Sequence, residues 1–443
     1  MEDLTVMVVD GSARAHVISD AYERSPNVKR IIVTPGNDFI GWNRRKEVIV
    51  VPADLKKPET ILEVARKYRP HLTDVCQDDA LAAGTVDVLE ASGFAAFGPT
   101  KAAAKIEWDK GWSRDFMRNN GIPYPSYERF SNEVLGRRHV DKIYEKDPNA
   151  FIYVKAGGLV AGKGAIPARN VHQALGAVNS MSGFGEAGNE FVIEEGMIGE
   201  EVSGYAFCDG ENYLTTKEAQ DHKTINPHDE GKNTGGMGAY TNVSLVTPKV
   251  RSKIRRLTIE PVIKGMNNNG TPYMGVLYQG LMIDENGNPR VVEYNARFGA
   301  PESEVIVPGI KTPMDQIAFA AREKRLSQIS LEEDGRTRLG FVGASRGYPD
   351  DYSNVRGKRI HGLERAMDIP GVSVFSYGIA VRDGKFYANG GRLFIIVAEG
   401  DNICEARELG LEAMGGVFIE GNNLHFRHDI GWREVQRFYE SKE

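Results

Sequence analysis

The sequence predicts an α/β protein that begins with a parallel-sheet domain and continues into α+β regions. Three observations support this prediction. Short apolar runs alternate with helical patterns over residues 1–100, a glycine-rich middle third follows, and the last third favours strands. Strands and helices that alternate in this way form βαβ units, whose strands are parallel. At 443 residues the chain has room for about three domains.

The N-terminal sheet is predicted from its strands and the helices between them. The expected elements are strands at residues 4–9, 31–34 and 48–51 and helices at residues 60–68 and 81–92. Gly98-Pro99-Thr100 then ends the region, because Gly-Pro interrupts helices and strands alike. Thr100 can cap the helix expected at 101–119. We therefore predict a first domain over residues 1–100.

The remainder of the chain mixes strands, helices and glycine clusters. The expected elements are strands at 151–155 and 190–194, helices at 249–268, 314–324 and 404–414, and a hairpin of residues 275–283 and 290–295 that turns at Asn286-Gly287. Pro123 and Pro125 mark a linker, and the polar stretch 128–149 precedes the strand at 151–155. A second polar run, 332–338, indicates a boundary, so we predict domains over residues 101–330 and 331–443.

The composition excludes several classes of protein. Hydrophobic residues make up 41% and charged residues 26%, so the chain can bury a core. A formal net charge of −6 argues against a nucleic-acid binder. The three cysteines are too few and scattered for a disulfide framework or a zinc cluster, which favours a cytoplasmic location. The acidic start and the lack of a long apolar run predict neither export nor a membrane span.

The glycine cluster at 157–164 is similar to a phosphate-binding P-loop but departs from it at two points. Gly164 stands where a P-loop has the Ser or Thr that binds magnesium. Residues 165–168 do not begin the helix whose N-terminus would hold phosphate. Two interpretations remain: a plain turn, or a mobile glycine hairpin that covers a triphosphate while Lys155 and Lys163 supply positive charge.

Glu293 and Asn295 form a candidate metal site on the second strand of the hairpin. They lie two residues apart, so the strand repeat points both side chains to one face. A carboxylate and an amide oxygen suit Mg²⁺, which completes its coordination with water and phosphates. The predicted turn places Glu293 opposite Gly280 and Gln279 on the far face, so Gln279 is not a predicted ligand. The alternative is a solvent-facing polar edge.

Further polar groups extend this candidate site. Arg297 follows at the next step of the alternation and suits a transferring phosphate or a substrate carboxylate. The glycine-rich turn at 233–238 allows the backbone to approach an anion closely. His222 is either a surface loop histidine, which we favour, or a general base. Glu194-Glu195 and Glu200-Glu201 are either solvated charges or groups that bracket a nucleoside.

Together these motifs resemble the ATP-grasp ligases and, over nearly the whole chain, the glycinamide ribonucleotide synthetase family. Their order and spacing, rather than any single fragment, carry the resemblance. The landmarks are Arg14 and His16, Pro35-Gly36-Asn37, Gly98-Pro99-Thr100-Lys101, Lys155-Ala156, Ala161-Gly162-Lys163-Gly164, Ile193-Glu194-Glu195, Gln220-Asp221-His222-Lys223, residues 233–240, Asn295-Ala296-Arg297-Phe298-Gly299, Gly390-Gly391-Arg392 and His428-Asp429-Ile430-Gly431.

The resemblance implies a fold and a reaction. The fold is a Rossmann-like N-terminal domain, an ATP-grasp core of two α+β subdomains with a mobile lid at about 122–193, and a small C-terminal α+β domain. The reaction joins glycine to 5-phosphoribosylamine through glycyl phosphate, giving glycinamide ribonucleotide, ADP and phosphate in purine synthesis. ATP and Mg²⁺ or Mn²⁺ are the implied cofactors. The resemblance further implies a cytoplasmic monomer or weak homodimer that binds neither nucleic acid nor membrane.

The resemblance also assigns roles to individual residues. The implied catalytic residues are Arg297, Lys163 and Asp221; the ATP-binding residues are Lys110, Lys155, Gly162, Lys163, Gly164, Glu194, Glu195 and Glu201; the metal ligands are Glu293 and Asn295; the substrate-binding residues are Arg14, His16, Asp221, Lys223, Gly235, Gly236 and Arg297. Gly390-Gly391-Arg392 either reaches the purine side of the site or forms a structural turn.

Five positions depart from the family pattern. The family has acidic residues where this chain has Ala15, Gly157 and Ala300, Arg where it has Thr224, and Glu where it has Asp78. The ATP and metal residues are therefore more intact than the acceptor residues. Two alternatives follow: a paralogous ATP-grasp ligase with another acceptor, and a catalytically weakened nucleotide-binding protein.

Overall fold

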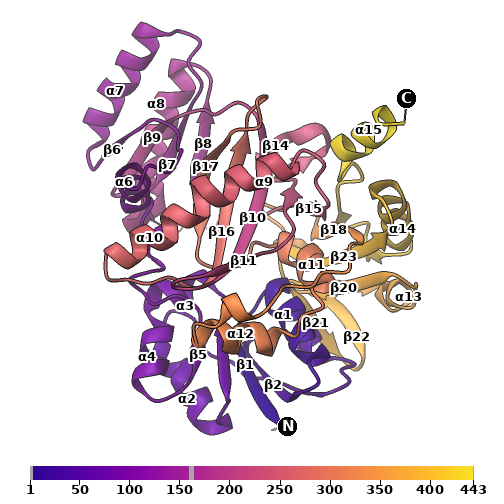
Figure 1. Cartoon of the computed structure of the whole chain (residues 1–443). Coiled ribbons are helices and arrows are strands. Elements are labelled where there is room, and N and C mark those ends of the chain that lie inside the picture. The colour runs from indigo at the N-terminus through magenta and orange to yellow at the C-terminus, as the bar shows by residue number, and fades with distance from the viewer. Residues whose placement is uncertain (1–2, 159–163, 443) are drawn as a thin grey trace.

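The computed structural model describes residues 3–158 and 164–442, which are organised around three main sheets. A five-stranded sheet holds the N-terminal strands, a separate four-stranded sheet follows, and a ten-stranded sheet runs through the rest. In Figure 1 the N-terminal sheet lies at the bottom, the four-stranded sheet at the upper left and the C-terminal elements at the right. No helix in the described ranges is long and apolar enough to cross a membrane.

The N-terminal sheet has the strand order β3-β2-β1-β4-β5, and its pairs are parallel as predicted. Its elements are β1 (Leu4–Asp10), α1 (Ala13–Arg24), β2 (Val28–Pro35), β3 (Glu47–Val50), α2 (Pro58–Tyr68), β4 (Leu72–Val75), α3 (Asp78–Ala83), α4 (Thr85–Ala91) and β5 (Ala96–Phe97). The single helix predicted at 81–92 is wrong. Gly84 has a φ of 93°, which separates α3 from α4.

The helix predicted at 101–119 is also divided. It forms α5 (Lys105–Trp108) and α6 (Lys110–Asn119). Asp109 leaves the helix with φ −123° and ψ 92°, and its carboxylate caps α6 by accepting a hydrogen bond from Trp112 N at 2.9 Å. This break makes Lys110 the first residue of α6.

The four-stranded sheet is antiparallel with the order β6-β9-β7-β8, and two helices accompany it. The elements are β6 (Tyr127–Phe130), α7 (Glu133–Lys146), β7 (Ile152–Ala156), β8 (Ala165–Ala168), α8 (Val171–Asn179) and β9 (Phe191–Glu195). The glycine cluster therefore connects two paired strands, as predicted, although residues 159–163 lie outside the described part. The polar stretch 128–149 contains α7, whose buried face is formed by Gly136, Val140 and Tyr144 among charged residues.

The ten-stranded sheet has the order β17-β16-β10-β12-β15-β18-β23-β20, with β11 on β10 and β25 on β18. Its strands are β10 (Glu200–Asp209), β11 (Tyr213–Thr215), β12 (Ala219–Asp221), β15 (Gly238–Thr241), β16 (Met274–Ile283), β17 (Pro289–Asn295), β18 (Thr337–Ser345), β20 (Val372–Ser376), β23 (Arg392–Gly400) and β25 (Leu424–His425). Because β15 pairs with β18, the sheet continues across the boundary predicted near residue 331.

Helices cover this sheet on both sides of that boundary. They are α9 (Pro248–Ile254), α10 (Glu260–Asn268), α11 (Glu302–Ile306), α12 (Met314–Arg322) and α14 (Ile403–Gly415). The helix predicted at 249–268 contains a π-helical turn at Arg255–Ile259, which divides it into α9 and α10. The helices predicted at 314–324 and 404–414 are confirmed as α12 and α14.

Two smaller sheets complete the described part of the chain. One pairs β13 (Thr224–Asn226) with β14 (Glu230–Asn233), and the other holds β19 (Arg359–His361), β21 (Ile379–Arg382), β22 (Lys385–Ala388) and β24 (Phe418–Ile419). The tail also carries α13 (Leu363–Met367) and α15 (Trp432–Glu440), which were not predicted beside the helix at 404–414. In α15, charged residues between Trp432, Val435 and Phe438 obscured the helical repeat.

Candidate active site

The hairpin β16–β17 presents the two predicted metal ligands. Glu293 and Asn295 belong to β17, and Glu293 pairs with Gly280, so no side chain stands opposite its carboxylate. Gln279 is buried on the other face, where its Oε1 accepts a hydrogen bond from Thr258 Oγ1 at 3.0 Å. The predicted register at Glu293 and the exclusion of Gln279 are confirmed.

Four cations surround the carboxylate of Glu293. Lys110 Nζ lies 3.6 Å from Glu293 Oε2, and Lys223, Lys155 and Arg297 also act on the carboxylate. Burial opposes its ionisation, but these cations lower the pKa of Glu293 to about 2. The carboxylate is therefore ionised at neutral pH.

This donor set fits a hard divalent cation. An ionised carboxylate and an amide oxygen two residues apart on one strand face supply two oxygen ligands, and Mg²⁺ bound in this way takes its other ligands from water and phosphate. Among residues 3–158 and 164–442, no group of three or more His, Cys, Asp or Glu side chains could hold a metal ion. The metal role of Glu293 and Asn295 stays a prediction.

The described end of the glycine cluster lies beside these residues. Lys110 N donates a hydrogen bond to Gly157 O at 3.0 Å, while the Lys110 side chain faces Glu293. Lys110, Lys155 and Glu293 line one narrow cleft. Gly164 O accepts a hydrogen bond from Ala156 N at 2.9 Å. Gly162 and Lys163 lie outside the described residues.

A buried ion cluster joins helix α6 to both the four-stranded sheet and the hairpin. Arg114 donates to the two carboxylate oxygens of Glu194 at 2.7 and 3.0 Å and to the carbonyl oxygen of Val292 at 2.6 Å. Val292 sits in a bulge of β17, which leaves this carbonyl available. Lys155 Nζ lies 2.8 Å from Glu194. The solvated-charge interpretation is therefore wrong for Glu194, which is 2% exposed, whereas Glu195 is exposed.

Burial opposes the charge on Glu194, yet Arg114 and Lys155 lower its pKa to about 2. Burial lowers the pKa of Lys155, and Glu194 opposes that effect. The close contact between Glu194 and Lys155 thus favours the charged form of both side chains. Its position between the four-stranded sheet and α6 is consistent with the nucleotide-binding role predicted for both residues.

Glu107 on α5 is a site residue that the sequence analysis missed. Its Oε1 lies 2.8 Å from Arg297 Nη2, and its Oε2 accepts a hydrogen bond from Ala296 N at 2.8 Å. The carboxylate thereby fixes both the guanidinium and the backbone just beyond β17. Glu107 lies three residues before Lys110, but a charged residue in a helical pattern usually indicates a solvated face.

Arg14 and His16, predicted to bind substrate, are buried on α1 at contacts with later parts of the chain. Arg14 donates to Asp10 Oδ2 at 2.6 Å and to Phe298 O at 2.9 Å. His16 Nδ1 accepts a hydrogen bond from Ser376 N at 3.0 Å, and burial lowers the pKa of His16 well below its usual value. These side chains therefore join the N-terminal sheet to the loop after β17 and to β20. Their contact with substrate stays a prediction.

The predicted substrate-binding turn packs against Asp221. Gly236 has a φ of 102°, and a Cβ at Gly236 would lie 2.7 Å from Asp221 Oδ1. This oxygen is buried and has no hydrogen-bond partner in the part of the chain that the structure describes. Burial and the nearby Glu302 raise the pKa of Asp221. Lys223, two residues on, forms an ion pair with Glu201.

The C-terminal part of the chain reaches this turn through Arg392. Its Nη1 donates to the carbonyl oxygens of Gly235 and, at 2.8 Å, Ala300. Its guanidinium carbon lies 4.2 Å from the centre of the Tyr377 ring. Tyr348 Oη accepts a hydrogen bond from Gly235 N at 3.0 Å. The predicted substrate-binding turn is therefore held by groups from the last third of the chain.

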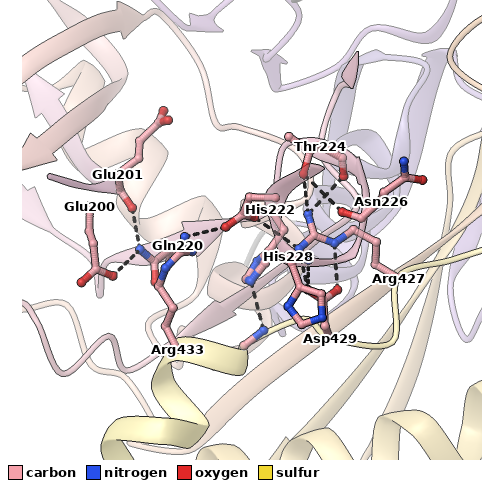
Figure 2. Close-up of polar contacts among 12 residues, drawn as sticks. Glu200, Glu201, Gln220, His222, Thr224, Asn226, His228, Arg427, Asp429 and Arg433 are labelled. Carbon is pink, nitrogen blue, oxygen red and sulfur yellow. Dashed lines mark hydrogen bonds and ion pairs between the residues drawn. The ribbon is translucent and has the colours of Figure 1, made fainter. Parts of the chain in front are cut away.

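His222 is buried in a polar network (Figure 2). Its Nε2 accepts a hydrogen bond from Gly431 N at 3.2 Å. Burial and the Arg427 guanidinium lower the pKa of His222 to about 4, so the imidazole is neutral at pH 7. The surface-loop interpretation is wrong, because the segment around Gly431, 209 residues later in the chain, covers His222.

Thr224 contacts a fully buried arginine in the same network (Figure 2). Arg427 Nη1 donates to Thr224 O at 3.1 Å and to Thr224 Oγ1 at 2.8 Å, and Arg427 Nη2 lies 2.8 Å from Asp429 and 3.3 Å from Asp229. A guanidinium therefore lies beside position 224, although the residue itself is threonine.

The other departures from the family pattern lie in different settings. Ala15 is fully buried on α1, and Asp78 begins α3. A Cβ at Gly157 would lie 2.9 Å from Glu190 O, so a larger residue there would need a shifted backbone. Ala300 contributes its carbonyl oxygen to the arginine of β23.

The fold and the site define an ATP-grasp enzyme, and comparison with known proteins bears this out. Models of the phosphoribosylglycinamide synthetase N domain, ATP-grasp (A) domain and C domain match residues 4–107, 108–303 and 338–433. The chain belongs to the phosphoribosylglycinamide synthetase family.

Curated relatives and solved structures agree with this assignment. The phosphoribosylamine–glycine ligase of Escherichia coli K12 is 37% identical over 438 residues, and that of Vibrio parahaemolyticus is 36% identical over 437 residues; each match covers 98% of this chain and 99% of the relative. The crystal structure of phosphoribosylamine–glycine ligase from Thermotoga maritima has a TM-score of 0.79 at 27% identity and covers 96% of this chain and 100% of that chain. A biotin carboxylase from Campylobacter jejuni shares the fold, with a TM-score of 0.70 at 14% identity.

Proposed function

We propose that this chain ligates glycine to 5-phosphoribosylamine in purine biosynthesis, with ATP converted to ADP and phosphate. Family membership over nearly the full length supports this activity. The observation that carries it is the group of cations around Glu293, in a cleft lined by Lys110 and Lys155. Such a site neutralises phosphate charge during phosphoryl transfer.

The chemistry takes two steps. An oxygen of the glycine carboxylate attacks the γ-phosphorus of ATP, the bond from that phosphorus to the bridging oxygen breaks, and ADP leaves. The amine nitrogen of phosphoribosylamine then attacks the acyl carbon of glycyl phosphate, the amide bond forms, and phosphate and a proton leave.

The residues of this chain support both steps by charge and position. Lys110 and Lys155 line the cleft and would neutralise the phosphates, and Arg297, held by Glu107, adds positive charge that acts on Glu293. Mg²⁺ or Mn²⁺ held by Glu293 and Asn295 would add positive charge at the phosphates.

A turnover assay tests the proposal. The purified protein is incubated with ATP, Mg²⁺, glycine and freshly generated phosphoribosylamine, and both ADP and amide are measured. We expect both products in equal amounts. ADP that depends on glycine but comes without amide would indicate another acceptor, and nucleotide binding without turnover on any amine would indicate a nucleotide-binding protein. Replacing Mg²⁺ with Mn²⁺ in the same assay compares the two metals.

We also propose the division into domains at 1–100, 101–330 and 331–443, with a lid at about 122–193. The family matches at 4–107, 108–303 and 338–433 support this division, and so does the separate four-stranded sheet. A cytoplasmic location and a monomeric or weakly dimeric state remain part of the proposal. Sedimentation measurements over a range of protein concentrations test the latter.

A further inference from the structure

Arg392 at the start of β23 uses only one side of its guanidinium on protein groups. Nη1 donates to the carbonyl oxygens of Gly235, Gly236 and Ala300. Within residues 3–158 and 164–442, Nε and Nη2 have no hydrogen-bond partner, and no carboxylate oxygen lies within the 4.0 Å of an ion pair. One edge of the guanidinium, with two N–H groups side by side, is therefore unengaged.

The lack of a carboxylate partner distinguishes Arg392 from three other arginines of the site. Arg14, Arg114 and Arg297 each pair with a carboxylate, namely Asp10, Glu194 and Glu107. Arg392 is half-buried, and a partly desolvated guanidinium is stabilised by an anion that hydrogen-bonds to it. Arg392 instead stacks on the Tyr377 ring, while Glu304 and Asp221 act on it from beyond ion-pair distance. Its free edge is thus a place where an anion would be stabilised.

Gly235 keeps the free edge of Arg392 open. A Cβ at Gly235 would lie 2.9 Å from both Cζ and Nη2 of Arg392 and 3.3 Å from Nε. Gly235 is not among the glycines with positive φ, so its backbone conformation does not require glycine. A side chain at position 235 would therefore press against the two unengaged nitrogens, and glycine leaves them uncovered on this side.

We propose that the free edge of Arg392 binds the phosphate monoester of the amine substrate, an inference that rests on the proposed function. Nε and Nη2 present the parallel N–H groups that match two phosphate oxygens. Arg392 is not among the residues that line the cleft of Lys110, Lys155 and Glu293, and its own contacts are with Gly235, Gly236 and Ala300. Arg392 therefore lies outside the phosphoryl-transfer centre, where the carboxylate of glycine reacts, and suits the distal end of the second substrate.

Binding of ribose 5-phosphate and of ribose tests this assignment without turnover. Calorimetry with the full-length protein compares the wild type with Arg392→Ala, Arg392→Lys and Arg382→Ala, an exposed arginine of β21 that serves as the control. We expect the wild type to prefer ribose 5-phosphate, Arg392→Ala to lose about 10- to 100-fold of that affinity, and Arg392→Lys to keep part of it. Arg382→Ala should bind as the wild type does.

A second variant separates binding from loop structure, since Arg392→Ala also removes bonds to three carbonyl groups. Gly235→Ala keeps the arginine in the chain but sets a methyl group 2.9 Å from its Cζ and Nη2, so the methyl group should displace or cover the free edge and also weaken ribose 5-phosphate binding. ATP affinity should stay within about twofold in every variant, and in the turnover assay the glycine KM should not change. A wild type that does not prefer ribose 5-phosphate over ribose, unchanged binding in both variants, or a rise confined to the glycine KM would overturn the assignment. Failure to form amide in the wild type would refute only the proposed function.

Discussion

The contact between Glu107 and Arg297 yields a quantitative prediction for Glu107→Gln. Glu107 Oε2 accepts a hydrogen bond from Ala296 N at 2.8 Å, and Glu107 Oε1 forms an ion pair with Arg297 Nη2, also at 2.8 Å. A glutamine amide has one accepting oxygen, so its NH₂ group must face one of these two donors. The variant keeps the shape of the side chain but removes one charge-assisted contact.

Loss of one polar contact with a charged group costs about 1.5–3 kcal/mol. If this contact positions Arg297 in the transition state, its loss raises the activation free energy by the same amount, and kcat should fall by about 10- to 150-fold. ADP release, measured with a coupled assay at saturating ATP and glycine, gives kcat, and Glu63→Gln on the exposed face of α2 is the matched control.

The outcome separates positioning from general stability. The KM for ATP should stay close to that of the wild type, because Glu107 acts on Arg297 rather than on the lysines of the cleft. A variant with wild-type kcat would refute the role of Glu107. A fall in melting temperature without any change in kcat would show that the contact contributes only to folding.

Three further predictions follow from the site. Glu293→Gln should abolish turnover with the fold intact by circular dichroism, whereas Glu285→Gln on the exposed hairpin turn should be active; comparable rates in both would contradict the metal assignment. The pKa of Glu194 is depressed to about 2 from 4.5, so its stabilisation is complete above about pH 4.5 and about 3 kcal/mol is lost as the pH falls toward 2. Urea unfolding at pH 6 and pH 3 should therefore show a shallower pH dependence in Glu194→Gln than in the wild type. Gly236→Val should lower stability by more than about 1 kcal/mol, since a Cβ there would lie 2.3 Å from Pro301 Cδ at positive φ, and a thermal melt unchanged from the wild type would argue against this strain.

Features of the fold that depend on residues close together in the sequence were predicted well. The parallel N-terminal sheet, the β16–β17 hairpin and the pairing of Glu293 with Gly280 follow from alternation and turn residues. The register at the turn differs by one residue from the prediction, and the bulge at Val292 restores it. A bulge depends on the tertiary partner of its free carbonyl, here Arg114, which local sequence does not specify.

Long-range contacts account for most of what the sequence did not predict. The burial of His222 depends on Gly431, and the burial of Glu194 depends on Arg114. Glu107 has no distinctive neighbours in sequence, because its function depends on Arg297, 190 residues later. Charged residues are assigned to solvent by default, and only a folded chain shows which of them meet an opposite charge in the interior.

The continuous ten-stranded sheet limits how the molecule can move. Backbone hydrogen bonds between β15 and β18 join the C-terminal strands to the part of the sheet that contains the β16–β17 hairpin. A rotation of one part relative to the other would have to break these backbone hydrogen bonds. In the described ranges the four-stranded sheet shares no strand with its neighbours, so it has the greater mechanical freedom. If the four-stranded sheet moves away from the ten-stranded sheet and widens the cleft, we expect the rotation to occur at the end of α6. Such a rotation would break the hydrogen bond from Arg114 to the Val292 carbonyl oxygen.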